Sequence, residues 1–225
     1  MILVSREFLQ YEEDFIKYYI NIPKLYYKEK DDKDYTKNEM IAKINQIIFE
    51  DILIFMDIVE ESYNLLNKER IFIDSLTEFQ IGYKSNDIIS LAIEFSQLSG
   101  FSDISYLKGY NYDFNLEREI HLKDLFKDDS DFLNILKKYI FIQVKKIFIE
   151  FGVYKEELDY FEEDNINLDE DNTFYFTNEF LVLPFSSCEI HKEILNLLEI
   201  KIPFNKIYYY LSEYTIKNIV KKIIL

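Results

Sequence analysis

The chain has 225 residues and a mass of 27.3 kDa, which is enough for one large domain or two small ones. Hydrophobic residues make up 48% and charged residues 30%, a balance typical of folded proteins and not of disordered ones. The formal net charge is −16, from 42 Asp plus Glu against 26 Lys plus Arg. This charge argues against nonspecific binding to nucleic acid and against docking on anionic lipid, since both need a basic face, and it permits a cationic protein partner.

The N-terminus and the cysteine count bear on the compartment. The chain does not open with a basic stretch followed by an apolar one, so we expect no signal peptide. No run of about 18 apolar residues occurs, so we expect no membrane insertion. Cys188 is the only cysteine, which excludes an intrachain disulfide and favours a reducing compartment. On these features alone the chain is expected to be soluble and cytoplasmic.

The first predicted element is a strand over residues 15–22. Its apolar residues alternate and share one face: Ile16, Tyr18, Ile20 and Ile22. Pro23 is expected to end the hydrogen-bond ladder of this strand or to mark a sheet edge, because proline has no amide hydrogen to donate. Residues 28–35 follow as a charged loop.

A long amphipathic helix is predicted next. Its apolar residues recur at intervals of three and four and form one stripe: Ile41, Ile44, Ile48, Ile52, Phe55, Val59, Tyr63 and Leu66. Thr36 and Glu39 have the spacing of a capping box, which places the helix start at Thr36. A helix of about 30 residues is not stable from propensity alone, so we expect the stripe to lie on a sheet.

Three strands with short connections then predict an antiparallel meander. Asn86-Asp87 is expected to form the hairpin turn between the first two strands. The residues that share one face of each strand are, in chain order, Phe79, Ile81 and Tyr83, then Ile89, Leu91, Ile93 and Phe95, then Tyr106, Tyr110, Tyr112 and Phe114.

The remaining chain predicts a second helix and short strands. The helix runs from Asp129 to Phe151 with Gly152 as its C-terminal glycine, and its stripe is Leu133, Leu136, Ile140, Val144, Ile147 and Phe151. An acidic stretch over 156–171 is partly loop. A hairpin around Asn178-Glu179, a strand from Ile200 to Ile202 and a helix from Ser212 to Leu225 complete the predicted elements.

Helices in blocks beside antiparallel strands predict the α+β class. We expect a long helix packed on an antiparallel sheet, followed by a second, smaller α/β lobe. The two lobes are predicted at residues 1–100 and 101–225, packed together across a soft boundary.

Cysteine and histidine do not form a recognisable site in the sequence. Cys188 and His191 have half of a zinc spacing, but a structural zinc ion needs four ligands and His121 is the only other residue of either type. A Cys–His nucleophile pair would need a third group that orients the base, and no spacing specifies one. We therefore expect a structural thiol, no catalytic residue, no metal and no cofactor.

The acidic run from Glu162 to Asp171 invites a calcium interpretation, which the EF-hand pattern does not support. Counted from Asp164, positions 3, 6 and 12 are Ile166, Asp169 and Tyr175, where the pattern needs a ligand, a glycine and a glutamate. A solvated acidic loop is the expectation. The tyrosine-rich strand from Tyr106 to Tyr112 could offer aromatic platforms to a sugar or a protein, although one face packed under a helix is favoured.

Several short motifs, in order, resemble a pair of bacterial cell-envelope domains. In that family an "iSl" strand precedes a "y-N-y-D-l … i-x-L-x-D-L-F" hairpin; here these are Ile89-Ser90-Leu91, then Gly109 to Phe114, then His121 to Phe126. The stretch from Asn172 to Ile207 resembles the family's "n-F-y-l-t … i-P-y" ending. Ile22-Pro23-Lys24-Leu25 and Ile44-Asn45 resemble its N-terminal partner domain.

This domain pair has no assigned function in most of its members, but the resemblance implies a class of function. Such domain pairs form the extracellular part of lysozyme-sensing anti-sigma factors and the non-catalytic N-terminal region of some peptidoglycan deacetylases. The resemblance therefore implies a non-enzymatic binding or sensing module with a protein partner, a basic one such as lysozyme. It also implies a location outside the cytoplasm, in contrast to the missing signal peptide.

The candidate binding residues lie where the chain departs from the family. A "G-G-A-H-G"-like loop usually follows the "iSl" strand, and the corresponding residues here contain one glycine and no histidine. The usual glycine near the end of the second lobe is also missing around His191-Lys192-Glu193. The candidate binding residues are Ser99, Gly100, Phe101, Ser102, Asp103, Tyr106 and Tyr110, with residues 159–171 as a further contact. The alternatives are an envelope-glycan hydrolase with a carboxylate pair and a cytoplasmic interaction protein.

Overall fold

A computed structural model describes residues 1–28, 35–66, 71–100, 103–150, 161–163, 166–186, 189–190 and 197–220 of the chain. The chain divides into two units, Met1–Glu119 and Ile120–Leu225. Each unit has its own sheet, with six strands in the first and three in the second. Within the described ranges, no helix has the length and hydropathy that a membrane crossing requires.

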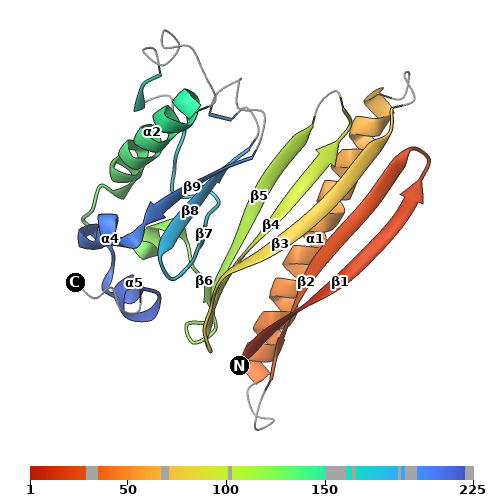
Figure 1. Cartoon of the computed structure of the whole chain (residues 1–225). Helices are drawn as coiled ribbons and strands as arrows, with labels where there is room; N and C mark the ends of the chain where they lie inside the picture. The colour runs from red at the N-terminus through yellow and green to blue at the C-terminus, as the bar shows by residue number, and fades with distance from the viewer. Residues whose placement is uncertain are drawn as a thin grey trace. The chain divides into compact units, whose positions relative to one another are not determined.

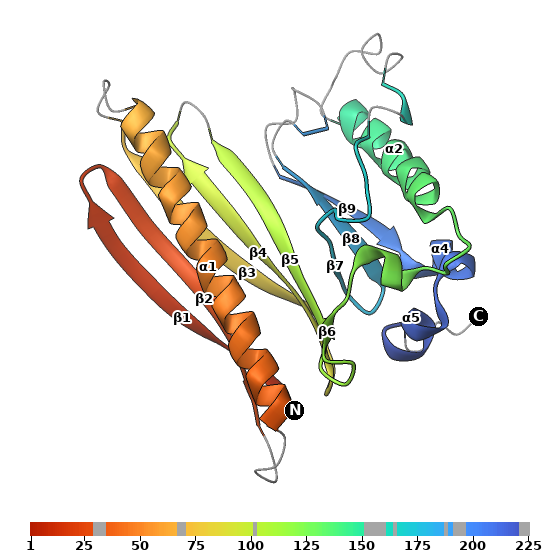
Figure 2. The same ribbon diagram turned by 180° about the vertical axis from the view of Figure 1, so that it is seen from behind.

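The first unit consists of a six-stranded sheet and one long helix (Figure 1). Its strands follow one another in the sheet as they do in the chain: β1 (Ile2–Glu13), β2 (Ile16–Tyr27), β3 (Ile73–Lys84), β4 (Ile88–Leu98), β5 (Ile104–Asp113) and β6 (Arg118–Glu119). Neighbouring strands are antiparallel except β2 and β3, which run parallel because α1 (Tyr35–Leu66) connects them. Figure 2 shows α1 lying along one face of this sheet.

The long helix and its apolar stripe are confirmed. Seven of the eight predicted stripe residues are buried against the sheet: Ile41, Ile44, Ile48, Ile52, Phe55, Val59 and Tyr63. The side chain of Leu66 lies outside the described residues. The helix begins at Tyr35, so Thr36 lies in its first turn and not at the predicted N-cap. Packing of this buried stripe against the sheet stabilises the helix, because helical propensity alone would not.

The first strand, β1, has no counterpart in the sequence prediction. It pairs with β2 along its whole length, from Ile2 opposite Tyr27 to Glu13 opposite Ile16. Residues 6–10 of β1 are exposed, so the strand lacks the contrast between a buried and a wet face that period-two patterns report.

The second strand, β2, does not end at Pro23 but continues to Tyr27. Its ladder with β3 stops at Ile20, so Pro23 lies where the strand no longer needs to donate an amide hydrogen to β3. The neighbouring positions are satisfied by side chains. The Asn21 amide donates to Thr77 Oγ1 at 2.8 Å, and the Leu25 amide donates to Asn45 Oδ1 of α1 at 2.8 Å.

The predicted antiparallel meander is confirmed by β3, β4 and β5. The turn at Asn86-Asp87 is closed by Ser85, whose amide donates to the Ile88 carbonyl at 2.8 Å. The Ser85 hydroxyl accepts the amides of Asp87 and Ile88 at 3.3 and 3.0 Å. The predicted lobe boundary near residue 100 falls in the turn between β4 and β5, whereas the two units divide between Glu119 and Ile120.

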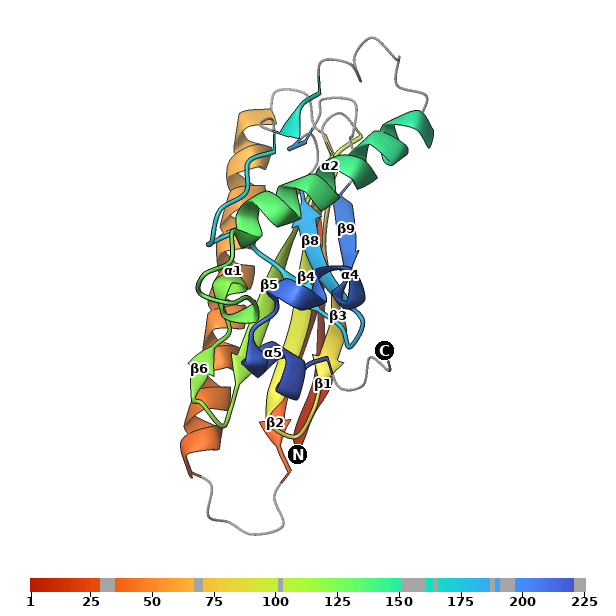
Figure 3. The ribbon, with the colours of Figure 1, turned by 90° about the vertical axis from the view of Figure 1, so that its left-hand side faces the viewer.

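The second unit contains a three-stranded antiparallel sheet, the 19-residue helix α2 and shorter helical segments. Its elements are η2 (Leu122–Leu125), α2 (Phe132–Glu150), β7 (Tyr175–Phe176), β8 (Phe180–Phe185), β9 (Leu198–Pro203), α4 (Phe204–Ile207), η4 (Tyr208–Tyr210) and α5 (Glu213–Asn218). Figure 3 shows α2 crossing this sheet. Both the hairpin at Asn178-Glu179 and the strand before Phe204 are confirmed, and the two units together confirm the α+β class.

The two predicted helices of this unit differ from the prediction at one end each: α2 begins at Phe132 and not near Asp129. The helix α2 buries residues spaced by four, namely Phe132, Leu136, Ile140, Val144 and Phe148. The predicted stripe members Leu133 and Ile147 are only partly buried. The last helix, α5, begins after Ser212 as predicted, because the Ser212 hydroxyl accepts the Thr215 amide as its N-cap, but it ends at Asn218. Phe151, Gly152 and residues 221–225 lie outside the described residues.

Candidate functional site

The turn between β4 and β5 carries most of the candidate binding residues. The Asp103 carboxylate accepts the amide of Ser99 at 2.9 Å and the amide of Gly100 at 3.2 Å. Gly100 has φ +73°, a left-handed conformation that glycine adopts at little cost. Phe101 and Ser102 lie outside the described residues. The Asp103 carboxylate therefore links the end of the turn at β5 to the end at β4.

Two large apolar side chains flank the turn, and both face solvent. Leu98, the last residue of β4, is 40% exposed, and Ile104, the first residue of β5, is 45% exposed. Asp103 is exposed beside them. An apolar pair next to a carboxylate on a hairpin end can contact a protein surface that is itself apolar and basic.

The two candidate tyrosines of β5 lie on the side of the sheet that α1 covers. The Tyr106 ring stacks on Phe95, with ring centroids 4.9 Å apart, and meets Phe55 of α1 edge-on at 6.3 Å. Tyr110 is buried, and its hydroxyl donates to Asp51 Oδ2 of α1 at 2.8 Å. The structure therefore separates them from the turn residues: Tyr110 fastens α1 to the sheet, and Tyr106 is half-buried in the core.

Asp51 links Tyr110 to a lysine. Its other oxygen, Oδ1, accepts Lys108 Nζ at 2.7 Å, and the Asp51 side chain is 17% exposed. Burial raises the pKa of Tyr106 to about 12, and the negative charge of Asp51 adds to this effect. Burial also raises the pKa of Tyr110, with Asp51 again contributing. Both phenols are therefore neutral at physiological pH, and the Tyr110 hydroxyl acts as a hydrogen-bond donor to Asp51.

Asp51 and Lys108 were not among the residues that the sequence singled out. Asp51 is next to the stripe residue Ile52, and Lys108 alternates with tyrosines that the sequence placed on one strand face. The signal that could have found them is an acid at the margin of the helix stripe and a lysine on the helix-facing side of a strand. Their pairing needs the packing of α1 on β5, which no spacing along the chain encodes.

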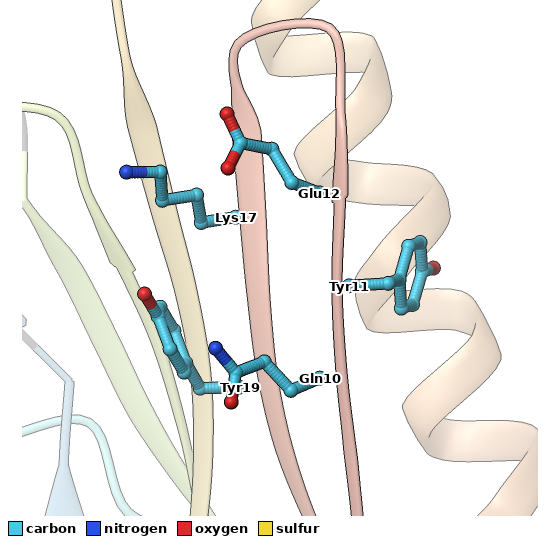
Figure 4. A pocket seen from close by; sticks show the side chains of 5 residues that line it. All are labelled: Gln10, Tyr11, Glu12, Lys17 and Tyr19. Carbon is cyan, nitrogen blue, oxygen red and sulfur yellow. The ribbon is translucent and has the colours of Figure 1, made fainter.

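A shallow depression of about 430 Å³ lies on the β1–β2 hairpin, lined by Gln10, Tyr11, Glu12, Lys17 and Tyr19 (Figure 4). Glu12 faces Lys17 across the two strands, and Gln10 faces Tyr19. Figure 4 shows these four side chains on one side of the hairpin and Tyr11 on the side of α1. The lining includes one carboxylate, so the depression does not supply the carboxylate pair that a glycoside hydrolase needs.

The acidic stretch of the second unit is anchored by its apolar residues. Phe161, Ile166 and Leu168 are buried, whereas Asp169 and Glu170 are exposed. The Asp169 carboxylate accepts the Asp171 amide at 2.9 Å, and Glu170 lies 3.7 Å from Lys123. The described acids Asp169, Glu170 and Asp171 therefore lie on the solvated surface. In the described part of the chain no group of three or more His, Cys, Asp or Glu could hold a metal ion.

The residues considered for zinc or nucleophilic chemistry are not brought together in what the structure describes. His121 is exposed, and its amide donates to Asp124 Oδ2 at 2.8 Å at the start of η2. Cys188 and His191–Glu193 lie outside the described residues.

Comparison with solved structures shows what fold the chain shares. A member of the DUF3298 family from Bacteroides fragilis is similar with a TM-score of 0.60 and 15% sequence identity, over 98% of this chain and 97% of that one. A DUF3298 family protein from Pseudomonas aeruginosa is similar with a TM-score of 0.58 and 10% identity, over 95% of this chain and 94% of that one. Both are proteins of a bacterial family of unknown function. No family model and no curated protein matches the sequence.

Proposed function

We propose that this protein is a non-enzymatic binding or sensing module whose partner is a cationic protein. The observation that carries the proposal is the end of the β4–β5 hairpin, where Leu98 and Ile104 are exposed beside Asp103. An interface needs apolar side chains to exclude water, and a carboxylate among them selects a basic partner. The acidic segment 159–171, of which residues 161–163 and 166–171 are described, is a second contact of the same sign.

The family resemblance supports the same class of function. The ordered motifs resemble the extracellular part of lysozyme-sensing anti-sigma factors and the non-catalytic N-terminal region of some peptidoglycan deacetylases, and this resemblance implies a binding or sensing module. The structural similarity to DUF3298 proteins extends over both units, so the resemblance in sequence and the resemblance in fold cover the same part of the chain.

The net charge of −16 supports a cationic partner independently of the family. A surface with this excess of acid raises the encounter rate of a basic protein at low ionic strength and has the opposite effect on an acidic one. Lysozyme, a small basic protein, is the natural probe because the resembled sensors bind it.

Calorimetric titration with lysozyme tests this proposal. We expect saturable heat at low ionic strength and weaker but measurable binding at moderate ionic strength, because part of the affinity is screened by salt. The variant Leu98→Ser/Ile104→Ser should lower the affinity by about tenfold or more, since exposed apolar residues at an interface centre carry much of its energy.

The matched control replaces two exposed isoleucines of α2, as Ile142→Ser/Ile149→Ser, and should bind as the unchanged chain does. Circular dichroism checks that both variants keep their fold. No measurable heat at tens of micromolar excludes lysozyme as the partner, and equal losses in both variants exclude the β4–β5 turn as the contact.

A further inference from the structure

The helix α1 carries large apolar side chains on the side that faces away from the sheet. Five of them are 43–84% exposed: Phe49, Leu53, Ile54, Ile58 and Leu65. They do not belong to the core, which takes the opposite stripe of the same helix. Isolated exposed leucines are ordinary, but five large apolar side chains on the outer side of one helix are a concentration that monomeric proteins seldom leave in water.

These side chains form two lines along the helix. Their angular positions around the helix axis follow from a rotation of 100° per residue, with Phe49 set to zero. Ile54, Ile58 and Leu65 then lie at 140–180°, and Phe49 and Leu53 lie at 0–40°. The first line lies on the flank that holds Asp51, so it runs beside β5. The second lies on the flank toward β2, where Asn45 of α1 exchanges hydrogen bonds with the backbone of Leu25.

An acidic row separates the two lines. Glu50, Asp57 and Glu61 are exposed and fall at 80–120° on the same scale, along the crest of the helix. Residues 44–66 contain no lysine and no arginine. Of these three acids, Glu50 accepts a hydrogen bond from Gln46 at 2.8 Å, which leaves its charge unneutralised. The outer surface of α1 is therefore apolar on both flanks and negative in the middle.

We propose that the outer surface of α1 is a docking site for a cationic amphipathic helix of a partner protein. A helix laid along α1 at the usual interaxial distance of about 8–10 Å would bury its apolar stripe against Ile54, Ile58 and Leu65. Those three residues span about 16 Å of the helix, which matches three turns of a partner. Lysines or arginines beside that stripe would face Glu50, Asp57 and Glu61.

The charges of the molecule argue against the other occupants of such a surface. Anionic lipid is repelled by the acidic row, whereas helices that lie on membranes carry lysine and arginine on their polar face. A second copy brings another −16 of charge. The helix α2 of a second copy could dock on α1, because its outer face exposes two lysines and two isoleucines: Lys138, Ile142, Lys146 and Ile149. Self-association through α2 is therefore the competing outcome of the test.

This proposal rests on the proposed function in one respect, the positive charge of the partner. It concerns the outer surface of α1 and not the β4–β5 turn, and it is tested with a peptide and not with lysozyme. The probe is a synthetic leucine–lysine peptide that forms an amphipathic helix of about five turns, and the control is its scrambled sequence with equal charge and no apolar face. Calorimetry of the full chain should show saturable binding of the first peptide and, at the same ionic strength, at least tenfold weaker binding of the second.

Two variants test the two parts of the surface. Ile54→Ser/Ile58→Ser should weaken peptide binding by about tenfold or more, with Ile142→Ser/Ile149→Ser as its matched control. Glu50→Gln/Asp57→Asn/Glu61→Gln should weaken binding and flatten its salt dependence. Its matched control removes three exposed acids of the second unit, as Asp128→Asn/Asp129→Asn/Asp171→Asn, and should leave both unchanged.

Each outcome is decisive. Equal affinity for the two peptides, or equal losses in test and control variants, overturns the proposal. Sedimentation velocity measures self-association of the chain without peptide. If the chain self-associates and Ile54→Ser/Ile58→Ser abolishes this, the surface binds a second copy. Binding of the peptide without binding of lysozyme refutes the proposed lysozyme contact and leaves the α1 site intact, and the reverse result refutes the α1 site alone.

Discussion

The two flanks of α1 use polar groups in opposite ways. On the β5 flank the tyrosine hydroxyl of Tyr110 donates to Asp51, which also holds Lys108. On the β2 flank Tyr18 is fully buried, and its hydroxyl has no hydrogen-bond partner among the described residues. The same residue type is a polar link on one side of the helix and a filler of apolar space on the other.

The β2 flank has a polar link of its own, which is made to the backbone and not to a tyrosine. Asn45 of α1 accepts the Leu25 amide at 2.8 Å and donates from Nδ2 to the Leu25 carbonyl at 2.9 Å. Tyr18 does not make this link and instead stacks on Tyr11, with ring centroids 4.6 Å apart. The helix is therefore fixed by side chain to backbone on one flank and by side chain to side chain on the other.

The largest expected effect comes from removing Asp51. The change Asp51→Ala leaves the buried hydroxyl of Tyr110 without its acceptor and Lys108 without its carboxylate, so we expect a loss of about 2–3 kcal/mol in the free energy of unfolding. Urea unfolding followed by circular dichroism measures it. Asp57→Ala, an exposed acid on the same helix, is the control and should change stability by about 0.5 kcal/mol or less. Equal effects of the two changes would show that the β5 flank is not fixed by this link.

A second prediction concerns alkaline pH. The pKa of Tyr106 rises from the ordinary 10.0 to about 12 in the folded chain, so the folded state keeps a proton that the unfolded state has lost between these values. The stability that this provides is complete below pH 10.0 and disappears as the pH rises toward about 12.

The urea midpoint should therefore fall more steeply over this range than it does in Tyr106→Phe. That variant is the control because lysines and the other tyrosines titrate in both proteins. Parallel pH profiles of the two proteins would contradict a raised pKa at Tyr106, while absorbance of the phenolate follows the titration directly.

The sequence predicted those parts of the fold whose burial follows a period along the chain. The stripe from Ile41 to Tyr63 repeats at three and four because one face of α1 is buried, and the meander alternates because β4 is buried on the α1 side at every second residue. The strand β1 was missed because it is an edge strand with a long exposed stretch. The parallel pairing of β2 with β3 was not predicted, because the two strands are connected through α1 and no hairpin turn marks them as neighbours.

The candidate site shows the same limit. The turn at Ser99–Asp103 could be located from a motif and its flanking strands, because a hairpin end needs glycine and a short polar residue. The role of Tyr110 could not, since its partner Asp51 is far away along the chain. The apolar outer surface of α1 was also overlooked, because Ile54 and Ile58 are neighbours in sequence of the buried stripe and look like its continuation.

The smallest expected effect separates the two tyrosines under α1. Tyr18→Phe removes a buried hydroxyl without a partner in the described structure and keeps the stacking on Tyr11, so the free energy of unfolding should stay equal or rise by up to about 1 kcal/mol. Tyr110→Phe is its matched control: it should cost about 1–2 kcal/mol, because the carboxylate of Asp51 loses a hydrogen bond. Both are measured by urea unfolding under the same conditions. A loss in Tyr18→Phe as large as that in Tyr110→Phe would mean that both flanks of α1 are held by tyrosine hydroxyls, and the difference between them would disappear.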